Sequence, residues 1–286
     1  MKIIYLMGAG RSGTTLLATL LGNAPSIITL GEMHQFLDYY LEDKPSSSGV
    51  KLKDCPFWSA VVGKLEQKYS RPELEAINKL RDRVEGHGHI PASLFSSNKK
   101  YQAFQKELFE IIKETHPTEA VLDSAKYISR ALQLARMDKE HVKIIYMVRD
   151  VRGVIFSFGK KVQTQKSAIS AMFYYSLINT FGLITQWVLG RRRVMRIQYE
   201  AVVEHPERSL ARMQTFLGQD LSAVLQKLQN EEPFEMPPII AGNRMATAKQ
   251  IKLKPDFAWK QHYSRGKQIL YYLLNFPLQL IFKYRI

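Results

Sequence analysis

Residues 8–15 read Gly-Ala-Gly-Arg-Ser-Gly-Thr-Thr and combine three glycines with one cation and three hydroxyl groups. They follow an apolar run at 3–6 and precede another at 16–21, which predicts a strand, a glycine-rich turn and a helix. Backbone N–H groups of such a turn converge on one point, and the helix N-terminus adds a partial positive charge there. We therefore expect an anion site that is sized for a phosphate-like group.

The type of anion is narrowed by two residues of this loop. Gly8 and Gly13 have the spacing of a nucleotide-binding P-loop, in which four residues separate two glycines. Thr14 stands where a nucleoside triphosphatase carries the lysine that reaches the β- and γ-phosphates. The cation, Arg11, lies inside the loop instead. The pattern favours a phosphate-like ligand without the apparatus for a triphosphate.

Two ionisable side chains follow the second apolar run. Residues 27–30 predict a short strand, and Gly31, Glu32, Met33 and His34 come directly after it. Open α/β sheets bind ligands at the carboxyl ends of their strands, so Glu32 and Arg11 are expected to face the same crevice. Taken alone, Glu32 and His34 are each also compatible with a solvated loop side chain.

A lysine occupies the corresponding position later in the chain. A short strand is expected to end at Leu122, with Asp123 or Ser124 capping a helix over 127–137. Lys126 then lies at a strand-to-helix turn, again at the edge where ligands bind. On this segment alone, a solvated lysine is the alternative interpretation.

A second anion site is predicted after the buried strand 143–148. Arg149 ends this strand, and Ser157 follows eight residues later, in the first turns of the next helix. The guanidinium offers a fork of N–H donors that suits phosphate, so the two side chains are expected to converge on one anion. A structural ion pair between Arg149 and Asp150 is the alternative.

The elements that position these residues alternate between strand and helix, which is typical of an α/β fold. Residues 36–118 interrupt the alternation, because they contain helical patterns at about 58–69, 72–84 and 100–115 and no clear strand. We expect a helical insertion here that forms one wall of a pocket. A long helix over about 167–190 is rich in aromatic residues, which favours a place in the core.

Composition limits the class of protein and of partner. The chain has 286 residues, of which 45% are hydrophobic, as in ordinary globular proteins. Its net charge of +15 implies anionic partners, although no nucleic-acid-binding motif is present and the basic residues are spread along the chain. The single cysteine, Cys55, excludes a disulfide within the chain and suits a reducing compartment. The two histidines of the Gly86–His89 linker lack further ligands at a familiar spacing, so no metal site is expected.

The ends of the sequence bear on localisation. The first strand begins at once, without a signal peptide, and no transmembrane helix of about 20 apolar residues is expected, so the predicted location is cytoplasmic. Residues 266–286 form an apolar, helical tail that is too short to span a bilayer. It is expected to pack on the domain, with contact to a membrane surface or a partner as the alternative.

Taken together, these motifs resemble the sulfotransferase family, whose members use 3′-phosphoadenosine 5′-phosphosulfate (PAPS). The run from Arg11 to Leu16 is similar to the family's 5′-phosphosulfate loop, and the run from Arg149 to Ser157 to its 3′-phosphate motif. Further similarity involves Gly31-Glu32, residues 123–126, Tyr199-Glu200 and residues 242–244, in order along about residues 2–260. The resemblance implies one domain over 1–286 with a three-layer P-loop (nucleotide-kinase-like) fold, in which helices flank a central, mostly parallel sheet.

The resemblance also implies roles for individual residues. Glu32 is expected to be the general base, with His34 as the second candidate, while Arg11 and Lys126 stabilise the sulfuryl group in transfer. Arg149 and Ser157 are expected to bind the 3′-phosphate. The other expected cofactor-binding residues are Gly10, Ser12, Gly13, Thr14, Thr15, Tyr199, Asn243 and Arg244. No metal is needed, because arginine and lysine supply the charge that Mg²⁺ supplies in kinases.

The acceptor remains open at this point. A hydroxyl or amine of a small molecule or saccharide is the expected acceptor, and a tyrosyl peptide is an alternative. A P-loop kinase of nucleotides or small molecules is the rival enzyme class. The oligomeric state and the shape of the acceptor pocket within 36–118 cannot be read from the sequence.

Overall fold

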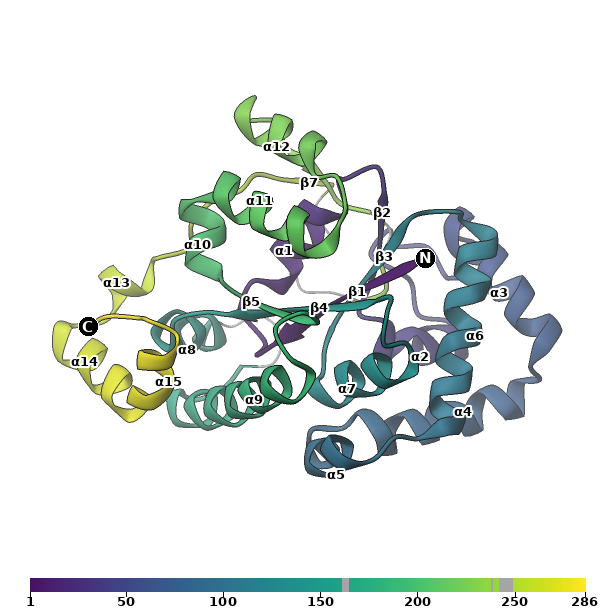
Figure 1. Ribbon diagram of the computed structural model, residues 1–286, viewed down its shortest axis with the longest axis horizontal. Helices are drawn as coiled ribbons and strands as arrows, with labels where there is room; N and C mark the ends of the chain where they lie inside the picture. Colours follow the sequence, from purple (N-terminus) through teal and green to yellow (C-terminus); the bar gives the residue numbers. More distant parts are fainter. Residues whose placement is uncertain (161–164, 238, 242–248) are drawn as a thin grey trace.

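The central sheet confirms the predicted fold class. The computed structural model describes all residues except 161–164, 238 and 242–248. Five strands form a sheet in the order β2-β3-β1-β4-β5, and every neighbouring pair is parallel. The strands are β1 (Lys2–Gly8), β2 (Ile27–Gly31), β3 (Ala120–Lys126), β4 (Val142–Val148) and β5 (Val194–Gln198). Helices lie on both faces of this sheet (Figure 1), which makes the three layers that the sequence predicted.

The strands face two separate cores because successive side chains of a strand point to opposite faces. Ile4 and Leu6 of β1 pack in one core, and Ile3, Tyr5 and Met7 pack in the other. The first core is covered by α1 (Thr14–Leu21), α10 (Tyr199–Glu204), α11 (Pro206–Leu217) and α12 (Ser222–Gln229). The second is covered by α7 (Ile128–Met137), α8 (Val151–Gly159) and α9 (Ala168–Leu189).

The segment 36–118 is helical, and no extended strand occurs in it. It follows the short 3₁₀ helix η1 (Met33–Gln35) and includes a second one, η2 (His87–His89). Its α-helices are α2 (Phe36–Leu41), α3 (Pro56–Lys68), α4 (Arg71–Glu85), α5 (Ile90–Phe95) and α6 (Lys99–Thr115). Their apolar faces join the second core, where Trp58 and Ile112 are fully buried. The segment thereby extends one layer of the sandwich past the β2 edge.

The C-terminal part begins with a small antiparallel pair, β6 (Phe234–Glu235) and β7 (Gln250–Ile251). Three helices follow: α13 (Trp259–His262), α14 (Arg265–Leu274) and α15 (Phe276–Ile281). The last two pack beside α8 and α9 (Figure 1), where the side-chain amide of Gln279 donates a hydrogen bond of 2.9 Å to the Tyr175 hydroxyl. The apolar tail therefore packs on the domain.

Two expectations need correction. The strand β3 continues to Lys126 instead of ending at Leu122, and neither Asp123 nor Ser124 caps the next helix, whose N-cap is Tyr127. The other correction concerns the expectation that the chain has no helix that could span a membrane. By length and composition, α9 is long and apolar enough to do so. Its inner face nevertheless packs on the sheet, because Gly182 lies so close to the Tyr146 ring that an added Cβ would stand 2.6 Å from it.

Candidate active site

The glycine-rich loop connects β1 to α1 and needs an unusual backbone. Arg11 and Gly13 both have positive φ angles, 69° and 92°. A side chain at Gly13 would lie 2.5 Å from the Tyr199 ring, so the loop can only close with glycine there. Gly13 is also the N-cap of α1 and offers no side chain to its first N–H groups, which leaves them directed at the space above the loop.

A cavity of about 580 Å³ opens above this loop. The backbone and side chains of Gly10, Arg11, Gly13, Thr14 and Thr15 form its floor, whereas the predicted Ser12 is fully buried behind the loop. Opposite walls come from the ends of β2 and β3 and from the start of α9. The carboxyl ends of β1, β2 and β3 therefore meet at one cavity, as the parallel sheet requires.

Glu32 and Lys126 meet inside this cavity and form an ion pair between Oε1 and Nζ. The side chains are 14% and 19% exposed, so the pair is largely shielded from water and still reachable from the cavity. Gln35 donates from Nε2 to the other carboxylate oxygen of Glu32 at 3.2 Å. Lys126 has a φ of 75°, a left-handed conformation that costs a non-glycine residue energy and turns the lysine toward Glu32 at the end of β3.

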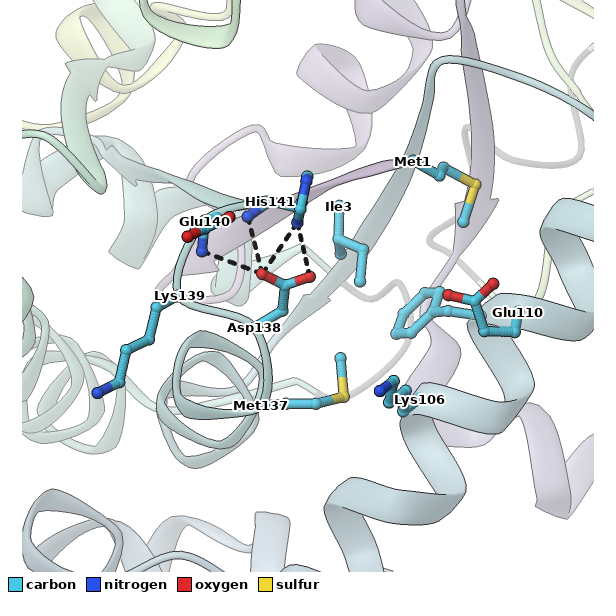
Figure 2. Close-up of a pocket in the computed structure, with 10 residues that line it drawn as sticks. Met1, Ile3, Lys106, Glu110, Met137, Asp138, Lys139, Glu140 and His141 are labelled. Carbon is cyan, nitrogen blue, oxygen red and sulfur yellow. Dashed lines mark hydrogen bonds and ion pairs between the residues drawn. The ribbon is translucent and has the colours of Figure 1, made fainter.

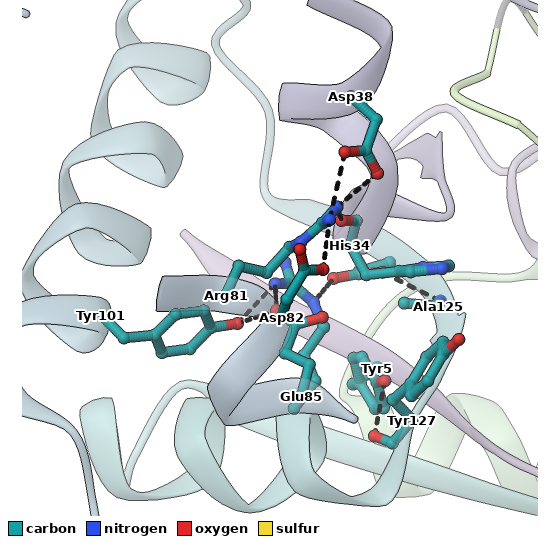
Figure 3. A network of polar contacts seen from close by, with 11 residues as sticks. Tyr5, His34, Asp38, Arg81, Asp82, Glu85, Tyr101, Ala125 and Tyr127 are labelled. Carbon is teal, nitrogen blue, oxygen red and sulfur yellow. Dashed lines mark hydrogen bonds and ion pairs between the residues drawn. The ribbon is translucent and has the colours of Figure 1, made fainter. Parts of the chain in front are cut away.

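A buried polar network that includes Glu85 and Tyr101 (Figure 3) holds the turn that carries Lys126. Arg130 of α7 is fully buried and binds Asp123 of β3 through Nε at 2.7 Å and Glu85 of α4 through Nη1 at 2.7 Å. The other oxygen of Asp123 accepts from the Ala125 N–H at 3.0 Å. Tyr101 of α6 donates its hydroxyl to Glu85. The helical segment 36–118 is thus tied to the strand end that positions the cavity lysine.

The second predicted anion site lies behind the loop. Arg149 is 4% exposed, and its guanidinium stacks on the Tyr199 ring with 4.2 Å to the ring centroid. It donates from Nη1 to the Arg11 carbonyl at 3.2 Å and from Nη2 to the Asp256 carbonyl at 2.6 Å. Within the described residues its Nε is buried without a hydrogen-bond partner. A buried guanidinium nitrogen without a partner lacks a hydrogen-bond acceptor, and an anionic ligand would supply one.

Asp256 balances part of this charge and was not predicted from the sequence. Its carboxylate lies 3.4 Å from Arg149 Nη2 and 3.3 Å from Lys160 Nζ. Although burial acts to raise it, the pKa of Asp256 is held below its usual value by these two cations. Tyr199 accepts a hydrogen bond from the Asp256 N–H at 2.9 Å. Tyr199 therefore supports both Gly13 and the Arg149–Asp256 pair.

Comparison with known proteins decides the enzyme class. A model of the sulfotransferase family matches residues 4–223 of this chain. The chain belongs to the sulfotransferase family. This confirms the predicted enzyme class, a sulfotransferase that takes PAPS as its co-substrate, and decides against the rival kinase. A search of curated protein sequences gives no match.

Solved structures with the same fold agree with this assignment. The sulfotransferase is similar to the sulfotransferase domain from the curacin biosynthetic pathway, with 19% identity, a TM-score of 0.58 and coverage of 100% of this chain and 98% of that chain. It is also similar to the sulfotransferase domain of the Synechococcus PCC 7002 olefin synthase, with 17% identity, a TM-score of 0.54 and coverage of 99% and 95%. At these identities the likeness concerns the fold.

His34 lies beside the cavity of the sulfotransferase, and the cavity lining does not include it. Burial lowers its pKa to about 2. The positive charges of Lys126, Arg130 and Arg81 add to the shift because they repel the protonated imidazole. Its ring packs on Tyr127 at a centroid distance of 4.6 Å, and its carbonyl accepts a hydrogen bond from Arg81. His34 is therefore a neutral, weakly basic imidazole at physiological pH.

Three predicted cofactor-binding residues remain: Ser157, Asn243 and Arg244. Ser157 is the seventh residue of α8 and is half-buried. Asn243 and Arg244 lie outside the described residues. Among the residues that the structure does describe, no group of three or more histidine, cysteine or carboxylate side chains is placed to hold a metal ion.

Several cavity residues of the sulfotransferase were missed by sequence reasoning. His87 of η2 stacks on Tyr127 at 4.7 Å, and burial lowers its pKa. Tyr174 of α9 accepts a hydrogen bond of 3.0 Å from the Gly10 N–H, and Lys166 lies next to it in the cavity wall. The sequence carried a signal for His87, the glycine-rich linker that surrounds it, but nothing in the linker indicates which cavity it reaches.

A second cavity, of about 370 Å³, lies at the opposite edge of the sheet (Figure 2). Ile3 and His141 line it beside the amino ends of β1 and β4, and His141 pairs with Asp138 at 3.0 Å. Because ligands of open α/β sheets bind at the carboxyl ends of the strands, this position does not belong to the reaction site.

Proposed function

We propose that this sulfotransferase transfers the sulfuryl group of PAPS to a hydroxyl or amine of a small-molecule or saccharide acceptor, with Glu32 as the general base. The observation that carries the proposal is the Glu32–Lys126 pair in a cavity whose floor is the anion-binding loop. A proton acceptor and a cation for the transferred group thus lie within one cavity, as sulfuryl transfer requires.

The donor is held at two anionic ends in this proposal. The N–H groups of the loop and of the first turn of α1, with the hydroxyls of Thr14 and Thr15, bind the 5′-phosphosulfate. Arg149, with Ser157, binds the 3′-phosphate, and the unpaired Nε of Arg149 supports this assignment within the described residues. Asn243 and Arg244 are proposed to close over the cofactor.

The chemical step is an in-line displacement. Glu32 takes the proton of the acceptor hydroxyl while the oxygen of that hydroxyl forms a bond to sulfur. The bond from sulfur to the bridging oxygen breaks at the same time, and its electron pair stays on the 5′-phosphate of the leaving 3′-phosphoadenosine 5′-phosphate (PAP). Arg11 and Lys126 stabilise the charge on the sulfuryl and bridging oxygens, an effect worth about 10²–10³ in rate for one preorganised donor.

The ion pair also gives a reason for ordered activation of the base. Without donor, Lys126 neutralises Glu32. The phosphosulfate carries more negative charge than a carboxylate, so its arrival draws Lys126 away and leaves Glu32 free to accept a proton. His34 is the weaker candidate for the base, because an imidazole with a pKa of about 2 has little affinity for a proton.

Replacing Glu32 by glutamine tests the base. Glu32→Gln is expected to reduce kcat by about 10²–10⁴, the usual contribution of general-base catalysis. PAP should bind at least as tightly as to the unaltered enzyme, because Lys126 no longer has a carboxylate partner. Calorimetry with PAP and single-turnover rates with PAPS measure the two quantities. Unchanged turnover would remove the base assignment, and His34→Asn and His87→Asn are the comparison variants.

The acceptor class is tested by a screen with radiolabelled PAPS. Hydroxyl- and amine-bearing metabolites, saccharides and tyrosyl peptides are offered to the full chain, and labelled products are separated. The cavity supports a small polar acceptor, because its free wall carries Tyr39, His87 and Tyr127. Labelling of tyrosyl peptides alone would overturn the small-molecule and saccharide assignment.

A further inference from the structure

Exposed apolar side chains are concentrated on one side of the molecule. Fourteen large apolar residues are exposed among those that the structure describes. Twelve of them lie on α9, α14, α15 and the C-terminal residue, and the two others are Val50 and Phe95. Trp187 and Phe173 of α9 are 84% and 75% exposed. Soluble proteins rarely expose such residues together without a partner.

The apolar side chains form a stripe along α9. Ile169, Phe173, Leu177 and Trp187 follow the helical period on the face that points away from the sheet. None of the 22 residues of α9 is charged. The exposed face of α4 differs in this respect, because it carries the charged residues Glu75, Lys79 and Asp82. The outer face of α9 is therefore not built to face water.

The C-terminal hairpin of helices continues this face. α14 and α15 lie against α8 and α9 (Figure 1), and Ser176 of α9 donates to the side-chain oxygen of Asn275 at 2.8 Å. Leu273 and Leu274 of α14 and Leu280 of α15 are more than half exposed. We call the exposed residues of α9, α14 and α15 the apolar face.

Charge identifies what covers the apolar face. The stretches 151–199 and 257–286, which contain all three helices, hold thirteen lysines and arginines and no aspartate or glutamate. They account for thirteen of the fifteen net positive charges of the chain. An apolar surface whose own segments carry cations and no carboxylate matches an anionic lipid surface, in which acyl chains lie beneath negative headgroups. A second copy of the same face is a poor match, because the cations would repel one another.

We propose that the apolar face docks on the surface of an anionic lipid bilayer, with α9, α14 and α15 lying in the interface. The enzyme binds as a peripheral protein, since the inner face of α9 stays packed on the sheet. Tyr174, next to Phe173 in sequence, lines the reaction cavity. Docking therefore brings one wall of that cavity to the membrane.

The tryptophans provide a direct readout. Trp58 and Trp259 are buried at 0% and 4% exposure, so Trp187 is the tryptophan whose surroundings a membrane can change. Vesicles of equal parts phosphatidylcholine and phosphatidylglycerol should shift the emission of the full chain to shorter wavelength and carry the protein in flotation. Phosphatidylcholine vesicles should bind it less, and high salt should weaken binding to the anionic vesicles. Trp187→Phe should abolish the spectral shift. Absence of both shift and flotation with anionic vesicles overturns the proposal.

Matched variants separate the apolar and ionic contributions. Phe173→Ser with Leu273→Ser should lower binding to anionic vesicles by about tenfold or more for each side chain, and Val50→Ser should leave it unchanged. Arg265→Gln with Lys267→Gln should lower it by about fivefold for each cation. The control is Arg208→Gln with Arg212→Gln, two exposed positions of α11 on the other side of the sheet. Thermal unfolding and PAP binding verify that each variant is folded.

Two further results would contradict the assignment. Equal losses for the α11 control and the α14 variant would mean that binding follows net charge and not the apolar face. The other result is a chain that does not bind vesicles and forms a dimer by light scattering. If Phe173→Ser with Leu273→Ser converts that dimer to a monomer, a second copy of the chain is the occupant of the apolar face.

Discussion

Arg149 is the residue through which the enzyme is expected to distinguish PAPS from a nucleotide without the 3′-phosphate. Its guanidinium is buried between the Tyr199 ring and Asp256, and its Nε has no hydrogen-bond partner among the described residues. Tyr199 and Asp256 therefore hold the guanidinium in position before a phosphate binds to it. Preorganisation of this kind saves the entropy of ordering an arginine on binding.

Arg149→Ala should therefore weaken the binding of PAP by about 10- to 100-fold, the range of a charge-assisted hydrogen bond. Adenosine 5′-phosphate, which lacks the 3′-phosphate, should lose much less. Calorimetry with both nucleotides measures the difference. Equal losses for both would assign Arg149 to the structure of the loop, where it also binds the Arg11 carbonyl.

His34 makes stability depend on pH. Its pKa is about 2 in the folded chain, against a usual value of 6.5, because the site is buried and close to Lys126. Between these two values the unfolded chain binds a proton that the folded chain does not, so stability falls as pH falls below 6.5. The slope is about 1.4 kcal/mol per pH unit for this one group.

His34→Asn should remove that slope. The free energy of unfolding, measured with urea between neutral and mildly acidic pH, should fall less steeply in the variant than in the unaltered chain. His89→Asn, at an exposed position of η2, is the control and should keep the original slope. Parallel curves for His34→Asn and the unaltered chain would contradict the assignment.

At the scale of elements, the strand end and not the helix N-terminus sets the position of Lys126. The buried group of Arg130, Asp123 and Glu85 joins α7, β3 and α4. Burial raises the pKa values of both carboxyl groups, against the lowering effect of Arg130. Removing the cation would leave two buried carboxyl groups without a counter-charge.

Arg130→Met should lower the free energy of unfolding by about 3–5 kcal/mol at neutral pH. The deficit should shrink in acid, where Asp123 and Glu85 can protonate. Arg83→Met, at an exposed position of α4, should change it by less than about 0.5 kcal/mol. A chemical denaturation series over pH checks both. A loss that does not depend on pH would point to packing of the arginine stem instead of its charge.

The sequence predicted the elements better than their contacts. The ends of β2 and β4 were found because Glu32 and Arg149 follow short apolar runs, a pattern that depends only on neighbours in sequence. The end of β3 was placed at Leu122, whereas the strand continues to Lys126. Asp123 was misread as a helix cap because its partner Arg130 joins it only after β3 and α7 pack. The aromatic residues of α9 were assigned to the core, although Phe173 and Trp187 are exposed. Periodicity reveals that a helix has two faces, but tertiary packing decides which one is buried.

Across the whole molecule, the C-terminal residues are bound to the layer beneath the site. Tyr284 donates its hydroxyl to Glu200 Oε2 at 2.7 Å, and Arg152 donates to the Arg285 carbonyl at 2.6 Å. Glu200 in turn accepts from the Asp150 N–H, next to Arg149. Burial raises the pKa of Glu200, because it disfavours the ionised carboxylate. The hydrogen bonds from Tyr284 and Asp150 act against this effect and stabilise the carboxylate.

Tyr284→Phe should lower the free energy of unfolding by about 1–3 kcal/mol, because the buried oxygen of Glu200 loses its donor. Tyr271→Phe on α14 is the control, since the hydroxyl of Tyr271 has no hydrogen-bond partner among the described residues. Thermal unfolding of the two variants measures the difference. Equal stability would mean that the tail contributes by apolar packing alone.

The order of strands in the sheet has a consequence for how the chain is made. β1 is the central strand, yet its neighbours are β3 and β4, where Lys2 pairs with Ala120 and Ile3 with Val142. Ribosomes add about 5–20 residues per second, so β1 waits for roughly 6–24 s before its first neighbour, β3, emerges. Ile3, Ile4 and Leu6 spend that time without the sheet that will bury them. The innermost strand is therefore the segment for which we expect the earliest and longest protection by chaperones during synthesis.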